Sequence, residues 1–191
     1  MPGEAAILML ECIKDLTIAF QKAEPKMKGT KSSVAPSDLF KVNEDCKKLD
    51  SEKAVIFHNL AAKMLHAMKH ARPDTCTAVA FLTARVQEPD EDDWHKPCHL
   101  MKHVRGTKDL PLRLSANGSG ILKWWVDALF AVHPNMRGHS GGGLSLGHGF
   151  PITSSTKQKL NMCSSTETEV MGADDYMPAT CWTRCFLEAK G

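Results

Sequence analysis

The sequence changes its hydrophobic periodicity at Ala116-Asn117-Gly118-Ser119-Gly120, a run of turn-forming residues. Before this run, apolar residues recur every three or four positions, as in amphipathic helices. After it, three short strand-like segments are separated by turns that contain glycine or proline. We therefore predict a mixed α/β (α+β) chain with two parts, a helical region over residues 1–117 and a sheet-containing region over residues 118–191.

Four helices are predicted in the first part. The first covers residues 4–20, and the second begins at Asp50-Ser51-Glu52. The second helix should end at Arg72-Pro73-Asp74, because proline disfavours the helical conformation in the residue before it. Asp74 is then expected to cap a third helix. A fourth helix should begin near Asp92 or Asp93, where acidic residues suit the helix dipole.

The second part is predicted to be a three-stranded antiparallel meander followed by a helix. The strands are expected over Ile121–Val132, His139–Gly147 and Phe150–Lys157, since short turns join them. The first strand reads as buried although it carries Asp127. Ser164-Ser165-Thr166-Glu167 is a capping-box pattern for the final helix, in which Pro178 predicts a kink or a break.

Composition excludes several classes of protein. The chain has 191 residues and a net charge of +2, and it holds no run of 18 apolar residues that could cross a membrane. The apolar run near the N-terminus lacks a basic segment before it, which argues against a secretory signal. The seven cysteines form no C-x-x-C motif, so reduced thiols and an intracellular location, cytoplasmic or nuclear, are expected.

Basic residues and histidines suggest two kinds of binding site. Lys102 and Arg105 lie in a basic segment, Lys96 to Arg113, that could follow a phosphate backbone or form a solvated helix face. Two histidine series have i, i+4 spacing, which lets neutral imidazoles share a metal; they are His66 with His70, and His95 with His99 and His103. Neither series has an obvious third ligand, so surface or half-buried histidines are the preferred interpretation.

Several motifs resemble the Pol polyprotein of copia-type LTR retrotransposons. In the first part these are His70-Ala71-Arg72-Pro73-Asp74, Pro89-Asp90-Glu91-Asp92-Asp93-Trp94 and Val104-Arg105-Gly106-Thr107. They resemble the segment that follows the polymerase active site in that family. The resemblance implies that residues 1–117 correspond to the thumb and connection region of a reverse transcriptase.

Motifs in the second part resemble the start of the ribonuclease H domain of the same polyprotein. They are Trp125-Val126-Asp127-Ala128, Gly138-His139-Ser140-Gly141-Gly142, Ser155-Thr156-Lys157-Gln158-Lys159 and Ser164-Ser165-Thr166-Glu167-Thr168-Glu169. The resemblance implies that residues 118–191 form the N-terminal part of a ribonuclease H-like domain. Its natural partner would be an RNA–DNA hybrid, which Lys157 and Lys159 could contact together with Lys102 and Arg105.

The resemblance also implies a metal site. In that family, an aspartate on the first strand and a glutamate on the first helix bind two Mg²⁺ ions, and by position these would be Asp127 and Glu169. The family's later carboxylates and the paired aspartates of its polymerase have no counterpart in this sequence. We therefore expect the chain alone to be inactive, and the alternative hypothesis is a non-catalytic nucleic-acid-binding module.

Overall fold

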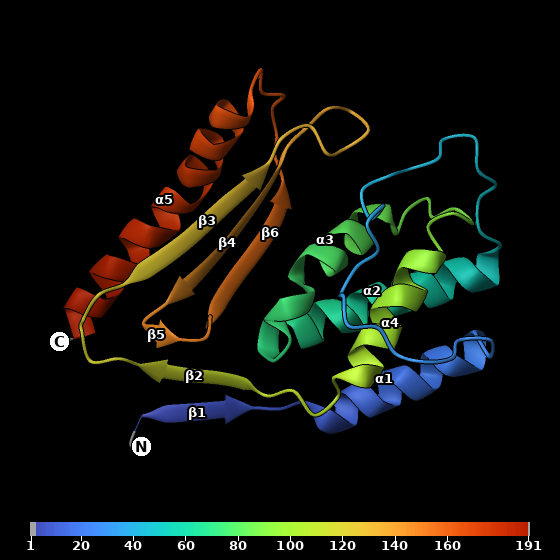
Figure 1. The fold of residues 1–191 in the computed structure, drawn as a ribbon, viewed down its shortest axis with the longest axis horizontal. Coiled ribbons are helices and arrows are strands. Elements are labelled where there is room, and N and C mark those ends of the chain that lie inside the picture. The colour runs from blue at the N-terminus through green and yellow to red at the C-terminus, as the bar shows by residue number, and fades with distance from the viewer. Residues whose placement is uncertain (1–2, 191) are drawn as a thin grey trace. The chain divides into compact units, whose positions relative to one another are not determined.

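The computed structural model describes residues 3–190 and divides into two compact units (Figure 1). The helical unit comprises Ala6–Leu112. The sheet unit combines the described residues up to Ala5 with those from Arg113 onward. The predicted mixed α/β composition is confirmed. None of the helices within residues 3–190 is both long enough and apolar enough to span a membrane.

The helical unit is built from packed amphipathic helices. Its elements are α1 (Leu10–Ala23), α2 (Ser51–His70), the short 3₁₀ helix η1 (Pro73–Thr75), α3 (Cys76–Arg85) and α4 (His95–Gly106). Helix α2 packs against α1 and α3, and α4 packs against the same two helices. Side chains at helical spacing fill the core between them, including Ile13, Phe20, Met64, Leu82 and Leu100. The apolar periodicity of the sequence therefore predicts this core correctly.

The predicted boundaries of the helices are confirmed in part. Asp50 caps α2, because its carboxylate accepts a hydrogen bond of 2.8 Å from the backbone N–H of Lys53. The predicted cap at Asp74 is wrong: this residue lies inside η1, and its carboxylate accepts hydrogen bonds from Arg72 instead. Helix α4 begins at His95, slightly later than predicted, which places Pro97 in its first turn, where proline is tolerated.

A small second sheet is the largest departure from the predicted fold. Its strands have the order β1-β2-β5, with β1 at Glu4–Ile7, β2 at Leu112–Ala116 and β5 at Gly147–His148. The predicted helix over residues 4–20 is therefore wrong at its N-terminal end. These strands are short and largely exposed, so they lack the alternating apolar pattern that marks a half-buried strand. Backbone pairing between distant segments holds them, and local sequence carries no signal of it.

The predicted meander is confirmed, with shorter strands. It consists of β3 (Lys123–Leu129), β4 (His139–Ser145) and β6 (Ile152–Lys157), which pair antiparallel in the order β3-β4-β6. In its register, Asp127 is opposite Gly141, and Gly141 is opposite Ser155. Directly opposite residues project from the same face of a sheet, so these three share one face.

Helix α5 (Ser165–Lys190) packs on the other face of the meander. A Cβ atom added at Gly172 would lie 3.3 Å from the Cβ of Ala128 and 3.5 Å from Val126, so the helix and β3 are in close contact. The ring of Tyr176 stacks on Trp124 with 5.5 Å between centroids. The residues of β3 that contact α5 are thus the even-numbered ones, at the two-residue spacing of a strand.

The start of α5 follows the capping-box prediction. The Ser164 hydroxyl accepts a hydrogen bond of 3.2 Å from the backbone N–H of Glu167. The Glu167 carboxylate in turn accepts one of 2.8 Å from the backbone N–H of Cys163. These two bonds satisfy amide groups that the first turn of a helix leaves without partners. Glu167 therefore helps to fix the start of α5.

Two expectations for this unit are wrong. Of the two alternatives at Pro178, the break does not occur, since α5 continues through the proline to Lys190, and the kink stays a prediction. The strand at Trp124–Ala128 is not buried: Trp125 is 61% exposed, and Asp127 is also exposed. Alternation along β3 explains the second error in part, because Trp124 and Ala128 on the α5 side are half-buried while Trp125 and Asp127 face away from that helix.

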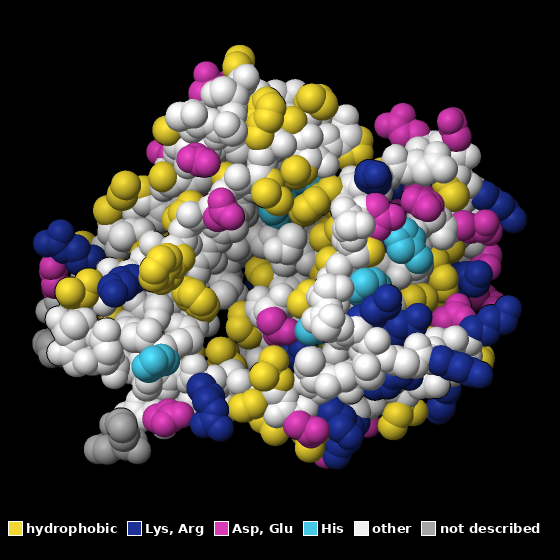
Figure 2. Space-filling model, viewed as in Figure 1, with side chains coloured by type: hydrophobic (Ala, Val, Ile, Leu, Met, Phe, Trp, Pro, Cys, Tyr) yellow, Lys and Arg dark blue, Asp and Glu magenta, His cyan; other side chains and the backbone are white. Residues whose placement is uncertain are grey.

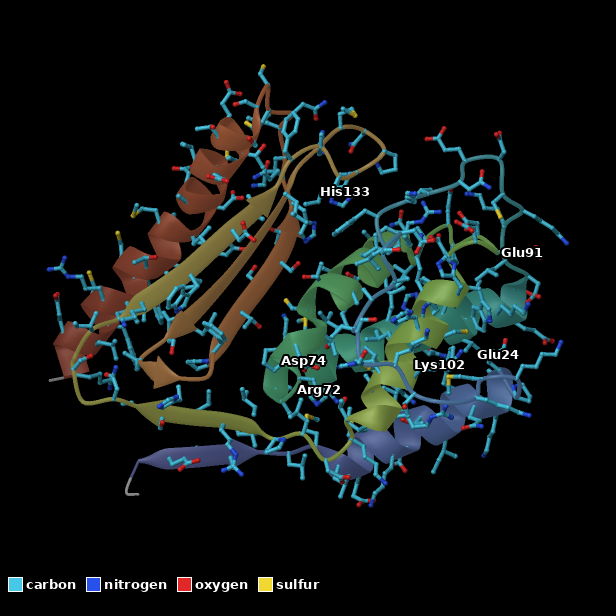
Figure 3. All side chains as sticks on the ribbon, in the orientation of Figure 1. Glu24, Arg72, Asp74, Glu91, Lys102 and His133 are labelled. Atoms are coloured by element: carbon cyan, nitrogen blue, oxygen red, sulfur yellow. The ribbon has the colours of Figure 1, made fainter. Side chains whose placement is uncertain are left out.

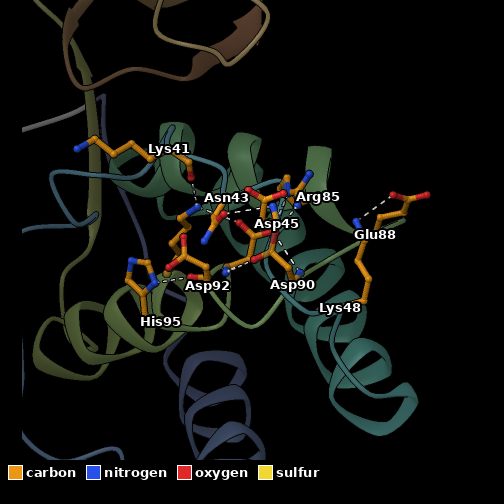
Figure 4. Close-up of polar contacts among 11 residues, drawn as sticks. Lys41, Asn43, Asp45, Lys48, Arg85, Glu88, Asp90, Asp92 and His95 are labelled. Carbon is orange, nitrogen blue, oxygen red and sulfur yellow. Dashed lines mark hydrogen bonds and ion pairs between the residues drawn. The ribbon is translucent and has the colours of Figure 1, made fainter.

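A buried ion-pair network fixes the connection between α3 and α4 (Figure 4). The Asp93 carboxylate is fully buried and accepts hydrogen bonds from Arg85 Nε at 2.6 Å and Lys96 Nζ at 2.9 Å. Arg85 also pairs with Asp90 at 2.8 Å. Lys96 is only 1% exposed and donates to the carbonyl of Lys41, so it is not part of a solvated basic face.

Substitution of Asp93 by alanine should strongly destabilise the helical unit. It would leave the buried Lys96 ammonium without its carboxylate, and the loss of one partner of a buried pair costs about 3–5 kcal/mol. Lys48→Gln is the matched control, because it removes an exposed pair with Glu88 and should change stability by about 0–1 kcal/mol. Urea unfolding, with hydrogen exchange in α3 and α4, measures both. Equal effects of the two substitutions would contradict the assignment.

Candidate functional site

Asp127 lies in the middle of β3 on the face of the meander that α5 does not cover. Its neighbours Val126 and Ala128 face Gly172 of α5, so strand alternation directs Asp127 to the opposite side. The carboxylate is exposed and accepts a hydrogen bond of 2.9 Å from the backbone N–H of Ala128. In this position Asp127 is open to a ligand that approaches the uncovered face.

Glu169 lies in the first turns of α5 and is exposed. Its neighbour Thr168 is buried against the sheet, and the Thr168 carbonyl accepts a hydrogen bond from the amide of Gln158. Strand alternation directs the Asp127 side chain away from the face that α5, the helix of Glu169, covers. Within residues 3–190, no three His, Cys, Asp or Glu side chains are grouped to hold a metal ion.

The face opposite α5 carries a chain of hydrogen-bonded side chains that sequence reasoning missed. Nε2 of His139 lies 2.6 Å from the Ser155 hydroxyl, and Nδ1 of His139 lies 3.1 Å from Nε2 of His133. His139 belongs to β4 and Ser155 to β6, while His133 precedes β4 in the loop seen in Figure 3. The signal that could have found them is the meander register, which makes His139 and Ser155 diagonal neighbours on one face.

Both histidines of this chain are held in the neutral form. Burial lowers the pKa of His139 to about 4. Burial also lowers the pKa of His133 to about 4, and electrostatic interactions with His139 and Lys157 add to the effect. His133 is 7% exposed and His139 is 5% exposed. A neutral imidazole has one nitrogen that donates and one that accepts, which gives the chain a direction.

The predicted nucleic-acid contacts have different surroundings. Arg105 is partly buried, and its guanidinium donates to the carbonyls of Met27 and Gly29 and to the side chain of Gln21. It therefore fastens the loop after α1 to α4. Lys102 is half-buried, and its carbonyl accepts a hydrogen bond from the backbone N–H of Lys31.

Lys157 and Lys159 are exposed at the end of β6. The pKa of Lys157 is lowered, first by partial burial and then by the nearby charge of Arg137. Lys157 and Arg137 therefore lie near one another in the sheet unit.

On the face that Figure 2 shows, the lysines and arginines of the helical unit are mixed with acidic residues and form no single-sign patch.

The histidines with i, i+4 spacing serve the helical unit in different ways. His66 and His70 are exposed on α2, with 4.4 Å between ring centroids. On α4, His95 lies 3.4 Å from Asp38, and His99 lies 3.0 Å from the hydroxyl of Ser33. These α4 side chains join the helix to the long segment between α1 and α2.

Motif residues of the helical unit meet in a second polar cluster (Figure 3). Arg72 is 2% exposed and donates two hydrogen bonds to Asp74, at 2.9 and 2.7 Å, and one of 2.7 Å to the Thr107 hydroxyl. His103 Nε2 lies 3.2 Å from the same carboxylate. Burial acts to raise the pKa of Asp74, but hydrogen bonds and charge from Arg72, and then from His103, hold it below its usual value.

Two known proteins are similar to the chain over most of its length. The "Retrovirus-related Pol polyprotein from transposon TNT 1-94" of Nicotiana tabacum is 28% identical over 138 residues, which are 72% of this chain. The chain spans 10% of that polyprotein. The "Secreted RxLR effector protein 161" of Plasmopara viticola is 25% identical over 131 residues, 68% of this chain and 92% of the effector. No protein-family description and no solved structure matches.

Asp74→Asn should destabilise the protein in a pH-dependent way. The folded pKa of Asp74 lies below the unfolded value, so its contribution is present above the unfolded pKa of about 3.9 and is lost as pH falls through the lowered folded pKa. At pH 7 the variant should lose about 1–3 kcal/mol, because Arg72 loses a charged partner. Urea unfolding between pH 7 and pH 2 should show this difference shrinking below about pH 4. Asp109→Asn, at an exposed site, is the control and should show little difference.

Proposed function

We propose that the chain is a retroelement Pol segment that joins a reverse transcriptase thumb and connection region to the first part of a ribonuclease H-like domain. The observation that carries this proposal is the order and packing of β3, β4, β6 and α5. An antiparallel meander followed by one covering helix is what the copia-type motifs imply, with Asp127 on its first strand and Glu169 near the start of its helix. Similarity to the tobacco Pol polyprotein supports the same origin.

The helical unit supports the proposal through the contacts between its motifs. Arg72 comes from the first motif and donates both to Asp74 of the same motif and to Thr107 of the third. Asp90 and Asp93 come from the second motif and bind Arg85. Residues that carry the resemblance are thus the ones whose buried polar contacts hold the helices together. A retained fold explains their presence without requiring catalysis by this unit.

We further propose that this chain does not cleave nucleic acid by itself. Two-metal hydrolysis needs carboxylates that converge on both ions. Strand alternation turns the Asp127 side chain away from the face that α5 covers, which supports this proposal. An exposed carboxylate on an open sheet face lacks the supporting groups that would hold an ion in one position.

A second candidate function is nucleic-acid binding without catalysis. The positive charges of Lys157 and Arg137 lie close together, and Lys159 follows two residues after Lys157, the last residue of β6. Two adjacent cations are favourable when a phosphate lies between them. The similarity to the effector covers 92% of that protein, so a sequence of this kind exists as a separate protein of comparable size. A module of this kind would bind an RNA–DNA hybrid or another duplex.

Cleavage of an RNA–DNA hybrid tests the first proposal. The purified chain, incubated with a labelled hybrid and excess Mg²⁺, should cleave no faster than its Asp127→Asn and Glu169→Gln variants. The physical reason is that strand alternation turns the Asp127 side chain away from α5, the helix that carries Glu169. Magnesium-dependent cleavage that disappears in Asp127→Asn would contradict the proposal, because it would require the acids to converge.

Binding to the same hybrid tests the second function. Affinity measured by fluorescence anisotropy should fall steeply with salt, since each phosphate contact releases a counterion. Lys157→Gln together with Lys159→Gln should weaken binding and reduce the slope of log affinity against log salt by about 2. Lys190→Gln, an exposed lysine on α5, is the matched control. Binding that is undetectable, or that is insensitive to salt, rules out this function.

A further inference from the structure

We propose that Ser155 is a reactive nucleophile, activated by His139 and oriented through His133, that accepts a small acyl or phosphoryl group. This inference is independent of the retroelement proposal, which assigns no role to these residues. It rests on the hydrogen-bond chain of the sheet face opposite α5, on the absence of a side chain at Gly141 opposite Ser155, and on the charges near it.

The distances match those of a nucleophile, a base and an orienting group. Nε2 of His139 lies 2.6 Å from Ser155 Oγ, within the range over which a base can accept the hydroxyl proton. The opposite ring nitrogen, Nδ1, lies 3.1 Å from Nε2 of His133. With Ser155 as donor, His139 Nδ1–H donates to His133, and both imidazoles remain neutral. Each member of the chain then has a hydrogen-bond role.

The loop before β4 holds His133 in place. The backbone N–H of His133 donates to the carbonyl of Arg137 at 3.2 Å, and the His133 carbonyl accepts a bond of 2.8 Å from Met136. Met136 and Ala131 have positive φ angles of 59° and 51°, a conformation that side chains other than glycine rarely adopt. Such strained positions persist only where the surrounding contacts enforce them. The loop is therefore shaped to present His133 to His139.

A glycine leaves room for a small group beside Ser155. Gly141 is directly opposite Ser155 in the sheet and projects from the same face. A Cβ atom added at Gly141 would meet no atom closer than the Asp127 carbonyl oxygen at 4.0 Å. The absent side chain thus leaves an opening between Ser155 and Asp127, and its small size restricts the group that can enter.

The charges near the site favour a reaction in which an oxygen becomes negative. Lys157 lies two residues beyond Ser155 on the same strand face and is the register partner of His139. Arg137 lies near Lys157. Their positive charges would stabilise the oxyanion that forms when a hydroxyl attacks a carbonyl or phosphoryl centre. Asp127, across Gly141, would instead disfavour substrates with a carboxylate near the reacting group.

The reaction has two steps, acyl transfer to Ser155 and hydrolysis of the acyl-serine. Ser155 Oγ forms a bond to the acyl carbon while its proton passes to His139 Nε2. The ester bond to the leaving alcohol breaks, and the departing alkoxide takes that proton from His139. Water then attacks the acyl-serine in the same way, which releases the carboxylic acid and restores the serine. A fluorophosphonate probe follows the first step alone, with loss of fluoride and a stable phosphonyl-serine.

Labelling of the full chain with a fluorophosphonate probe tests the proposal. Intact-mass spectrometry should show one adduct, and peptide mapping should place it on Ser155. His139→Gln should lower the labelling rate at least about tenfold, because general base catalysis contributes a factor of about 10²–10⁴. The wild-type rate should stay nearly constant from pH 8 to about 5.5 and fall toward pH 4, where His139 becomes protonated.

Matched variants separate reactivity from folding. Ser154→Ala is the control for Ser155→Ala, since Ser154 lies next to Ser155 but is opposite Gly142, on the face toward α5. It should label at the wild-type rate, whereas Ser155→Ala should not label. Gly141→Val should block labelling by filling the opening while the Ser155–His139 bond remains. His133→Gln should lower the rate and move the pH at which labelling falls.

The wild-type protein alone can overturn the inference. No adduct, or adducts distributed over several exposed serines, would show that Ser155 is not activated. An unchanged rate in His139→Gln would remove the base from the proposal. These outcomes do not depend on hybrid cleavage, so failure here is distinguishable from failure of the retroelement proposal.

Discussion

The packing of α5 on one face of the β3-β4-β6 meander determines the character of the sheet unit. The contact is close because Gly172 lies against Val126 and Ala128, and because a Cβ atom at Gly142 would lie 2.8 Å from the Tyr176 ring. Ser140 strengthens the same interface by donating to Asp175 at 3.1 Å. Because α5 packs on this face, strand alternation directs every other side chain of each strand to the opposite face of the sheet. Function in this unit therefore depends on which residues share each face.

The helical unit depends on a different constraint, the need to pair charges that its core encloses. Arg72, Asp93 and Lys96 are each 2% exposed or less, and each has hydrogen-bonded partners from another segment. An unpaired charge at such a depth would cost several kcal/mol, so these contacts restrict how the helices can pack. This explains why the motifs that resemble copia-type Pol proteins coincide with the buried polar clusters. Lys96, which begins the basic segment of the sequence, is one of these enclosed charges.

Sequence patterns predicted the elements whose cause is local. Helical spacing identified the core of α1 to α4, Asp50 marked a true cap, and the glycine-rich turns specified the meander. Patterns failed where the cause is distant in sequence. The strands β1, β2 and β5 are held by pairing with distant segments. Asp74 does not cap a helix, because its carboxylate contacts Arg72 and His103. The candidate site shows the same division. Position on strand or helix could be predicted for Asp127 and Glu169, but the face of the sheet could not.

On the face of the meander opposite α5, the strand register places Asp127, Gly141 and Ser155 in a single row. A shift of one residue in β3 would turn Asp127 toward α5 and Val126 away from it. A shift of one residue in β6 would separate Ser155 from His139. The register that turns Asp127 away from the α5 face is thus also the one that brings Ser155 and His139 together.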